Sequence, residues 1–364
     1  MTIPLVDVKA QYAPLLAELK DRIAGVLESG RFILGPNVQA FEREAAAYLG
    51  AGEAVGVANG TDALVLALDA LGVGPGDEVL CPAFTFYATA EAIARRGATP
   101  VFCDLEREAL NVDPADAAER VTSRTKAMIA VHLFGRPTRV AELPVGTPVV
   151  EDAAQAFGAV VGGRRVGTLG VAATFSFFPT KNLFGLGDGG LVATGDPELA
   201  ERVRLLRFHG SRDKQLFEAV GYNSRLDELQ AAALRLFLPQ VDGWNAARRE
   251  AAARYAELGL GEVCELPADE PGHVYHVYAV RTPERDRIAA ALREAGIGCA
   301  AYYATPLHLQ PVFRELGYRE GSLPETERAA RENLALPLWA GISPEQQKRV
   351  VECVHAAAAV GVTR

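Results

Sequence analysis

The chain has 364 residues, of which 49% are hydrophobic and 23% are charged, so it can bury a large core and we expect two domains. Its formal net charge of −9 gives no general basic field, which argues against nucleic acid or an anionic membrane as a partner. The five cysteines form no C-x-x-C pair, so we expect no disulfide framework, no zinc site and a cytoplasmic location. No apolar stretch approaches membrane-spanning length, and the N-terminus lacks the pattern of an export signal.

Along the first 240 residues, apolar runs typical of buried strands alternate with amphipathic runs typical of helices. The expected strands cover residues 54–58, 78–82, 100–104, 126–132, 148–152, 173–178 and 190–194, and the expected helices cover 63–71, 89–96 and 226–238. This alternation predicts a large α/β domain over residues 1–240, whose short connections gather polar residues at one edge of the sheet, where ligands usually bind.

The composition changes after Pro239, which closes the last of these helices. A charged helix is expected over 244–257, a strand over 273–281, a helix over 283–296, and the tail of a terminal helix over 356–359. We therefore expect a smaller C-terminal α+β domain over residues 241–364.

Lys181 lies between SFFPT (176–180) and NLFGLGDGG (182–190), downstream of an apolar run that ends at Asp152. This layout favours pyridoxal phosphate chemistry, because a lysine amine can hold the cofactor aldehyde as a Schiff base while a buried carboxylate keeps the pyridine nitrogen protonated. The alternatives are an exposed loop position for Lys181 and an ion pair with an arginine for Asp152. The glycines beside Lys181 indicate backbone held close to a ligand and favour the functional interpretation.

Three residues are candidates for binding the phosphate of the cofactor. Gly60 and Thr61 lie where a strand gives way to a helix, so their backbone N–H groups and the Thr61 hydroxyl could receive an anion. Ser176 could supply a second hydroxyl. Each has an ordinary alternative, a helix N-cap at or near Thr61 and a local hydrogen bond for Ser176, so the hypothesis depends on their combination.

A flat cofactor ring also needs cover on both faces. Phe86 and the small Ala154 could provide this cover, and Gln155 could reach the ring hydroxyl. Phe86 taken alone would more often be a core residue.

Together these segments resemble the DegT/StrS-type sugar aminotransferases, which are fold-type I pyridoxal phosphate enzymes. The resemblance covers nearly the whole chain and rests on the motifs FILGP (32–36), NGTDA (59–63), EDAAQ (151–155), SFFPTK (176–181), GDGG (187–190), GYNSRLDELQ (221–230) and PLH (306–308). It implies an aspartate-aminotransferase-like fold, with a large domain built on a mixed, mostly parallel sheet flanked by helices and a smaller C-terminal α+β domain.

The resemblance also implies roles for single residues. Lys181 would carry the Schiff base and shuttle protons, and Asp152 would contact the pyridine nitrogen. The other implied cofactor contacts are Gln155 at the ring oxygen, Phe86 on the ring, and Gly60, Thr61 and Ser176 at the phosphate.

A homodimer is implied as well, in which Asn223 reaches the phosphate of the neighbouring subunit's cofactor. The implied substrate contacts are Phe32, Tyr303, His308 and Arg225. Local sequence alone would make Asn223 a turn residue, and it would make Tyr303 and His308 parts of a turn packed by Pro306.

Lysine at position 181 favours transamination, because relatives that remove a sugar hydroxyl carry histidine there. We expect an amino group to pass from L-glutamate to a keto group of a nucleotide-linked sugar. The forms of residues 187–190 and 302–308 resemble members that aminate C3. A C4 aminotransferase and a pyridoxal phosphate-dependent sugar dehydratase are alternatives, and a noncatalytic, cofactor-binding regulatory dimer is an alternative of another class.

His273 and His276 have a spacing that would suit a metal site on a helix. However, the alternation VYHVY (274–278) predicts a strand, which would send the two histidines to opposite faces. We therefore expect no metal.

Overall fold

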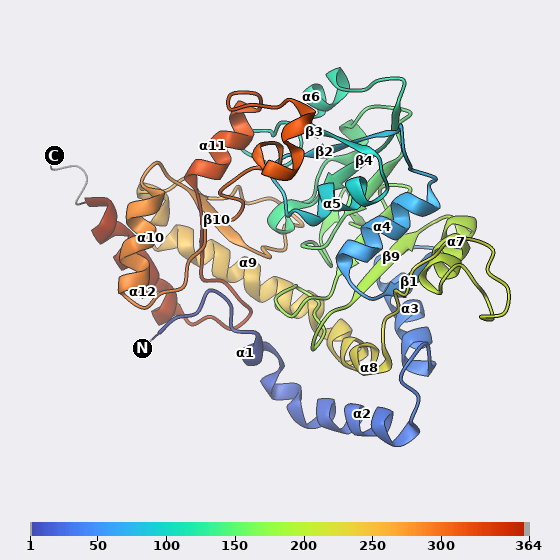
Figure 1. Ribbon diagram of the computed structural model, residues 1–364. Helices are drawn as coiled ribbons and strands as arrows, with labels where there is room; N and C mark the ends of the chain where they lie inside the picture. The colour runs from blue at the N-terminus through green and yellow to red at the C-terminus, as the bar shows by residue number, and fades with distance from the viewer. Residues whose placement is uncertain (1, 360–364) are drawn as a thin grey trace.

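The structure is a computed structural model and describes residues 2–359. One sheet of seven strands has the order β1-β9-β8-β5-β4-β2-β3 (Figure 1). The strands are β1 (Glu53–Val57), β2 (Glu78–Pro82), β3 (Thr99–Cys103), β4 (Thr125–Val131), β5 (Val149–Asp152), β8 (Ala172–Ser176) and β9 (Gly190–Thr194). Neighbouring strands are parallel except at β9, which runs antiparallel to both β1 and β8. The predicted mixed, mostly parallel sheet is confirmed.

Helices pack on both faces of this sheet and enclose two layers of core. On one face lie α4 (Gly60–Ala70), α5 (Ala88–Arg95) and α7 (Pro197–Arg207), which share a cluster with Val55 and Ile129. On the other face, α3 (Pro36–Leu49) and α8 (Glu228–Phe237) share a cluster with Phe175, and α2 (Leu16–Ser29) packs on α8. Strand residues alternate between these clusters because successive side chains of a strand point to opposite faces.

The C-terminal part of the chain builds a second, smaller core on the other side of the molecule (Figure 1). It contains the antiparallel pair β10 (Tyr278–Arg281) and β11 (Asn333–Leu336) with the helices α9 (Val241–Glu257), α10 (Arg285–Glu294) and α12 (Pro344–Ala359). Ile3 joins this core through a bridge to Ile297, whereas Leu307 and Phe313 pack on the large sheet. The division at residues 240 and 241 stays a prediction.

The remaining elements are short. They are α1 (Val8–Tyr12), α6 (Pro114–Glu119), α11 (Pro324–Glu332), the hairpin of β6 (Val160–Val161) and β7 (Arg164–Arg165), and the 3-10 turns at Ala13–Leu15, Leu133–Gly135, Val140–Glu142, Leu238–Gln240, Leu260–Glu262, Leu307–Leu309 and Pro311–Leu316.

One expected strand is largely absent, because only Tyr278–Arg281 of the predicted strand 273–281 is a strand. The N–H groups of Val274 and Val277 donate to the carbonyl oxygens of Gly135 and Phe134 at 3.0 and 3.3 Å, so this backbone is bound to a loop of the large sheet. Tyr275 in between has a positive φ of 43°, which a strand residue does not adopt. The idea of two histidines on opposite faces of a strand is therefore wrong.

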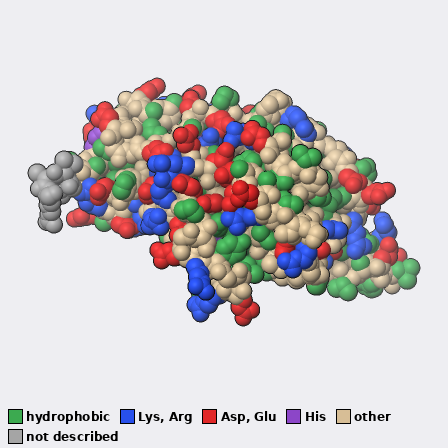
Figure 2. Space-filling model, turned by 90° about the horizontal axis from the view of Figure 1, so that it is seen from above, with side chains coloured by type: hydrophobic (Ala, Val, Ile, Leu, Met, Phe, Trp, Pro, Cys, Tyr) green, Lys and Arg blue, Asp and Glu red, His purple; other side chains and the backbone are tan. Residues whose placement is uncertain are grey.

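Acidic and basic side chains are interspersed on the face of the molecule shown in Figure 2. That face shows no single-sign basic field of the kind that attracts a nucleic acid backbone. Among the described helices, none combines the length and the apolar character that crossing a bilayer requires.

Candidate active site

A cavity of about 700 Å³ opens at one edge of the large sheet. The strands β1, β2, β4, β5 and β8 all end at this edge, and the antiparallel strand β9 begins there. The cavity is therefore lined by residues at the carboxyl ends of parallel strands, where α/β sheets bind ligands. Nine of the predicted site residues line it: Gly60, Thr61, Phe86, Asp152, Ala154, Gln155, Ser176, Lys181 and Tyr303.

One end of the cavity is suited to bind an anion. Helix α4 begins at Gly60, and its N-cap is Asn59, whose side chain accepts from the N–H of Asp62 at 2.8 Å. The N–H groups of Gly60 and Thr61 lie in the first turn, where no intrahelical acceptor exists, and the hydroxyls of Thr61 and Ser176 line the cavity beside them. Donors grouped in this way at a helix start are of the kind that binds a phosphate.

Glycine is required at two points of this end. A Cβ atom at Gly60 would lie 2.7 Å from Cβ of Ser176, so only glycine lets the helix start approach β8 so closely. A Cβ atom at Gly190 would lie 2.3 Å from the carbonyl oxygen of Asn59, so β9 also needs glycine where it meets this loop.

Asp152 lies at the end of β5 and is 6% exposed. Its Oδ2 accepts from the Thr89 hydroxyl at 2.8 Å, its Oδ1 accepts from the N–H of Ala154 at 3.3 Å, and Thr89 is itself bonded to Thr85 at 3.2 Å. Burial raises the pKa of the Asp152 carboxyl, although these hydrogen bonds and the charge of Lys181 act in the opposite direction. No arginine pairs with Asp152 in the described chain, so its charge is available to a ligand in the cavity.

Lys181 is half-buried and also lines the cavity, in a turn in which its own N–H donates to the carbonyl of Phe178 at 2.9 Å. Burial lowers the pKa of its amine to about 8, while the Asp152 carboxylate opposes this shift. A fraction of the amine is therefore uncharged near neutral pH, as attack on an aldehyde requires. The alternative of an exposed loop lysine is excluded.

Two hydrogen bonds fix the side chain of Gln155. Its Oε1 accepts from the N–H of Phe134 at 2.7 Å and its Nε2 donates to the Tyr303 hydroxyl at 2.9 Å. The Tyr303 ring stacks on Phe134 with centroids 6.1 Å apart, and both residues have positive φ, 58° and 56°. Strained backbone of this kind clusters at functional sites. One N–H of Gln155 remains for a ligand.

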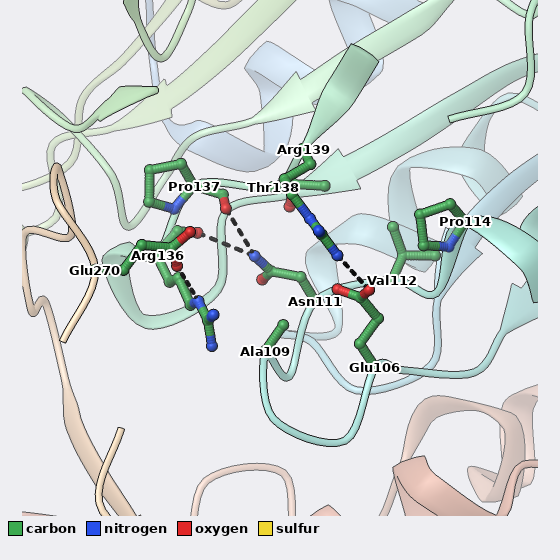
Figure 3. Close-up of a pocket in the computed structure, with 10 residues that line it drawn as sticks. All are labelled: Glu106, Ala109, Asn111, Val112, Pro114, Arg136, Pro137, Thr138, Arg139 and Glu270. Carbon is green, nitrogen blue, oxygen red and sulfur yellow. Dashed lines mark hydrogen bonds and ion pairs between the residues drawn. The ribbon is translucent and has the colours of Figure 1, made fainter. Parts of the chain in front are cut away.

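The loop that carries Phe134 is held from outside by a second polar cluster (Figure 3). Asn111 donates to the carbonyl oxygens of Arg136 and Pro137 at 3.3 and 3.1 Å, and Arg136 and Arg139 form ion pairs with Glu270 and Glu106. The hollow between these residues measures about 10 Å³, which suits a single water at most. It supports the loop and is too small for a substrate.

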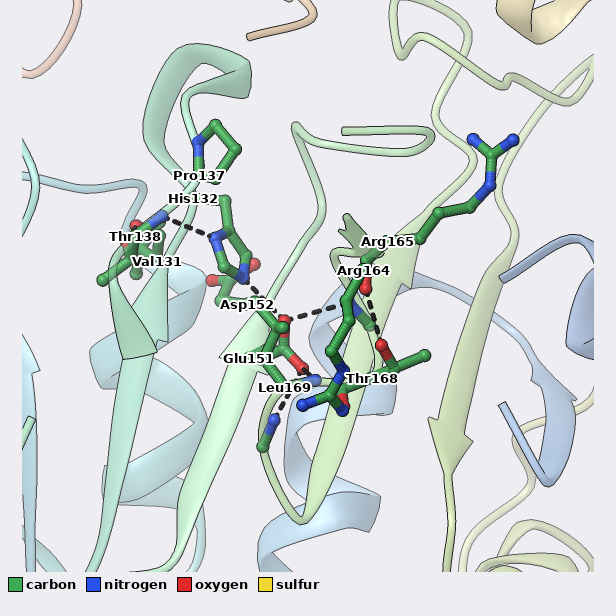
Figure 4. A network of polar contacts seen from close by, with 12 residues as sticks. Val131, His132, Pro137, Thr138, Glu151, Asp152, Arg164, Arg165, Thr168 and Leu169 are labelled. Carbon is green, nitrogen blue, oxygen red and sulfur yellow. Dashed lines mark hydrogen bonds and ion pairs between the residues drawn. The ribbon is translucent and has the colours of Figure 1, made fainter. Parts of the chain in front are cut away.

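Glu151, directly before Asp152, faces the opposite side of the sheet (Figure 4). It is fully buried and accepts from the N–H groups of Gly167, Leu169 and Gly170 at 2.7–2.9 Å and from Nε2 of His132 at 2.9 Å. His132 accepts from the N–H of Thr138 at Nδ1, so its proton lies on Nε2.

Four predicted site residues do not line the cavity. Phe32 is 44% exposed, Asn223 is exposed, and Arg225 lies with its guanidinium 5.9 Å from the Phe208 ring. His308 is 1% exposed and pairs with Glu327 at 3.2 Å, because Glu327 is fixed by the N–H groups of Gly321 and Leu323. His308 therefore lies in a packed turn outside the cavity of this chain, and its role toward the substrate stays a prediction.

Sequence reasoning missed three residues of the site. Asn59 caps α4, Thr89 bonds Asp152, and His276 lines the cavity. The Asn59 cap follows a common pattern of asparagine before a helix and could have been found. Thr89 and His276 lie 63 and 95 residues from their neighbours Asp152 and Lys181 in the sequence, and no local pattern indicates such contacts.

Comparisons with known proteins agree with this geometry. Residues 15–355 match the model of the DegT/DnrJ/EryC1/StrS aminotransferase family. The chain belongs to this family. Among its relatives within the family is a protein of Geobacillus stearothermophilus named pleiotropic regulatory protein, 49% identical over 97% of both chains. Another is the dTDP-3-amino-3,4,6-trideoxy-alpha-D-glucose transaminase of Streptomyces venezuelae, 45% identical over 97% of this chain and 95% of that protein.

A solved structure of the same family is S. venezuelae DesV in complex with a ketimine intermediate, with a TM-score of 0.95 and 45% identity over 98% of each chain. The predictions of an aminotransferase of fold type I with pyridoxal phosphate as its cofactor are confirmed. The residues that line the cavity fit that cofactor in their chemistry: hydrogen-bond donors at the start of α4 and at Ser176 suit a phosphate, Phe86 and Ala154 suit a flat ring, and Asp152 and Lys181 supply a carboxylate and an amine.

Proposed function

We propose that this aminotransferase moves an amino group from L-glutamate to the keto group at C3 of a nucleotide-linked sugar. The observation that carries the proposal is the joint presence, in one cavity of about 700 Å³, of an amine, a buried carboxylate and a phosphate-binding helix start. Support for the C3 position comes from the 45% identical relative, whose name denotes a 3-amino sugar transaminase.

The residues divide the chemistry among them. Pyridoxal phosphate, when bound, supplies the aldehyde that accepts the amino group and a ring that withdraws electrons. The first turn of α4 and Ser176 would hold its phosphate, and Asp152 would keep a proton on its ring nitrogen. Nζ of Lys181 would take a proton from the carbon that loses the amino group and return one to the carbon that receives it.

The proposal includes a second subunit that contributes residues to each active site. Asn223, Phe32 and Arg225 lie outside the cavity of their own chain, and the exposed fraction of Phe32 is 44%. We assign these residues to the neighbouring subunit's cofactor and substrate in a homodimer with shared active sites. The five cysteines are all unpaired in the structure, and we place the enzyme in the reducing cytoplasm.

The test is Lys181→Ala, with the exposed Lys126→Ala as its control. Wild-type protein loaded with pyridoxal phosphate should change its visible absorbance when glutamate is added, release 2-oxoglutarate, and return to the first spectrum with a keto-sugar nucleotide. Lys181→Ala should lose this turnover by at least about 10⁴-fold while its melting temperature is retained. Lys126→Ala should behave as wild type. A wild-type spectrum that does not respond to any amino acid would contradict the proposal.

The sugar is identified by a panel of C3- and C4-keto sugars on thymidine and uridine diphosphate. Reaction with C3-keto sugars alone supports the proposed position. Preference for C4-keto sugars would overturn it while leaving transamination in place.

A further inference from the structure

The C-terminal part of the chain supplies one wall of the active-site cavity, and His276 lies in that wall. The residues at the start of α4 and Asp152 belong to the edge of the large sheet, whereas four other lining residues come from the C-terminal part: His276, Val277, Tyr302 and Tyr303. His276 is 7% exposed as a residue, and nothing in the chemistry described above uses its imidazole.

One ring nitrogen of His276 is left without a partner. Nδ1 is buried and has no hydrogen-bond partner in the described residues, whereas Nε2 is the nitrogen that a ligand in the cavity can reach. A buried N–H without an acceptor is rarer and more costly than a buried acceptor without a donor, so the proton belongs on Nε2. The ring therefore presents an N–H donor to the cavity.

The ring is also kept neutral. Burial holds the pKa of His276 well below its ordinary value, and the positive charges of Lys181 and Arg248 act in the same direction. Arg248 is 1% exposed, and its partners in the described chain are the side-chain oxygen of Gln11 and the carbonyl oxygen of Leu338, neither of which is charged. A neutral N–H donor suits an uncharged oxygen better than a carboxylate, which is bound more strongly by a cation.

The backbone around His276 is fixed in an unusual conformation. Tyr275 has φ of 43°, and the flanking N–H groups of Val274 and Val277 are bound to the loop at Phe134 and Gly135. A Cβ atom at Gly135 would lie 2.9 Å from the backbone nitrogen of His276, so glycine is needed for this approach. Such strain persists where surrounding contacts hold it, and here it sets the imidazole in the cavity wall.

We propose that His276 binds the keto sugar, donating its Nε2–H to an uncharged oxygen of the sugar next to the carbon that receives the amino group. The position follows from the cavity, because His276 and Lys181 line the same space and a sugar whose keto carbon reaches the Lys181 amine enters it. The inference rests on the proposed function and makes His276 a residue that determines substrate preference.

The experiment measures the two half-reactions separately in three variants of the cofactor-loaded enzyme. His276→Leu removes the donor, His276→Gln restores an N–H donor, and His273→Leu is the matched control, a buried histidine of the same segment that does not line the cavity. Absorbance of the cofactor follows the glutamate half-reaction in one direction and the sugar half-reaction in the other.

His276→Leu should lower kcat/KM of the sugar half-reaction about tenfold or more, the loss expected for one hydrogen bond, and leave the glutamate half-reaction within twofold. His276→Gln should recover most of the loss, and His273→Leu should leave both half-reactions near wild type. If His276→Leu lost both half-reactions equally, or left the sugar half-reaction unchanged, this inference would be overturned and the proposed function would remain. A wild-type enzyme that aminates no keto sugar would overturn the proposed function and this inference with it.

Discussion

Glu151 and Asp152 are adjacent carboxylates at the end of one strand, and they have opposite environments (Figure 4). Glu151 is surrounded by three backbone N–H donors and His132, all at hydrogen-bonding distance. Asp152 accepts from one hydroxyl and from one N–H at the longer distance of 3.3 Å, and it lines the cavity.

The pKa values of the two carboxyl groups are shifted in opposite directions, in keeping with this difference. Burial opposes ionisation of both, but at Glu151 the hydrogen bond from His132 and the N–H groups of Gly167 and Gly170 outweigh it and lower the pKa. At Asp152 burial prevails and the pKa is raised. A buried carboxylate with all its acceptors used is structural, whereas one with acceptors left over is prepared for a ligand.

The largest effect is expected when the carboxylate on the cavity side is neutralised. Asp152→Asn keeps the shape and the Thr89 contact but removes the charge that holds a proton on the cofactor ring, so kcat/KM should fall about a thousandfold, or roughly 4 kcal/mol. Steady-state kinetics would show it, with the exposed Asp21→Asn as control. Activity within tenfold of wild type would contradict the assigned role.

For Glu151, the comparison predicts a loss of stability when the carboxylate is replaced. Glu151→Gln leaves an amide N–H₂ facing backbone N–H donors and a buried histidine without its acceptor, so the free energy of unfolding should fall by about 3 kcal/mol. Urea denaturation measures it. At a temperature where the variant remains folded, kcat should stay within about tenfold of wild type. A stable but inactive variant would show that Glu151 belongs to the chemistry after all.

A substitution at Thr89 can remove a single hydrogen bond to Asp152 and leave its carboxylate in place. Thr89→Val preserves volume but removes the 2.8 Å hydrogen bond, so kcat should fall about tenfold and the absorbance of the bound cofactor should shift with pH. Thr89→Ser should recover both. If valine and serine behave alike, the hydroxyl has no part in positioning the carboxylate.

The smallest effect is a difference in pH dependence between the two carboxylates in the cofactor-free protein. The folded-state pKa of Glu151 lies below the ordinary 4.5, so its stabilisation is complete above that pH and is lost as the pH falls through the folded value. The folded-state pKa of Asp152 lies above the ordinary 3.8, so its ionised form destabilises the fold at neutral pH and this penalty disappears on acidification.

Unfolding measurements from pH 7 down to about pH 3 should therefore show opposite trends for the two variants relative to wild type. Asp152→Asn should be more stable than wild type at pH 7 and lose that advantage in acid, whereas the deficit of Glu151→Gln should begin to shrink only below about pH 4.5. If the stability of both variants relative to wild type changed with pH in the same direction, the proposed difference between the two carboxylates would be wrong.

Much of the fold and the centre of the site follow from sequence patterns. Strand periodicity located all seven strands of the sheet, and strand ends located Gly60, Asp152 and Ser176 at one edge. The segment at 273–277 was mispredicted because its N–H groups bond to a loop about 140 residues away, which overrides its strand-like alternation. The contact of His308 with Glu327 could not be predicted, because Glu327 is brought close only by tertiary packing.

The contact between Gly190 and the carbonyl of Asn59 has a consequence for engineering of the enzyme. A side chain at position 190 would push the end of one strand into the loop that caps α4, so randomised libraries that include this position will mostly yield inactive clones. Diversity directed instead at Tyr302 and His276, in the wall that the C-terminal part contributes, changes the shape offered to a new sugar while the cofactor end stays as it is.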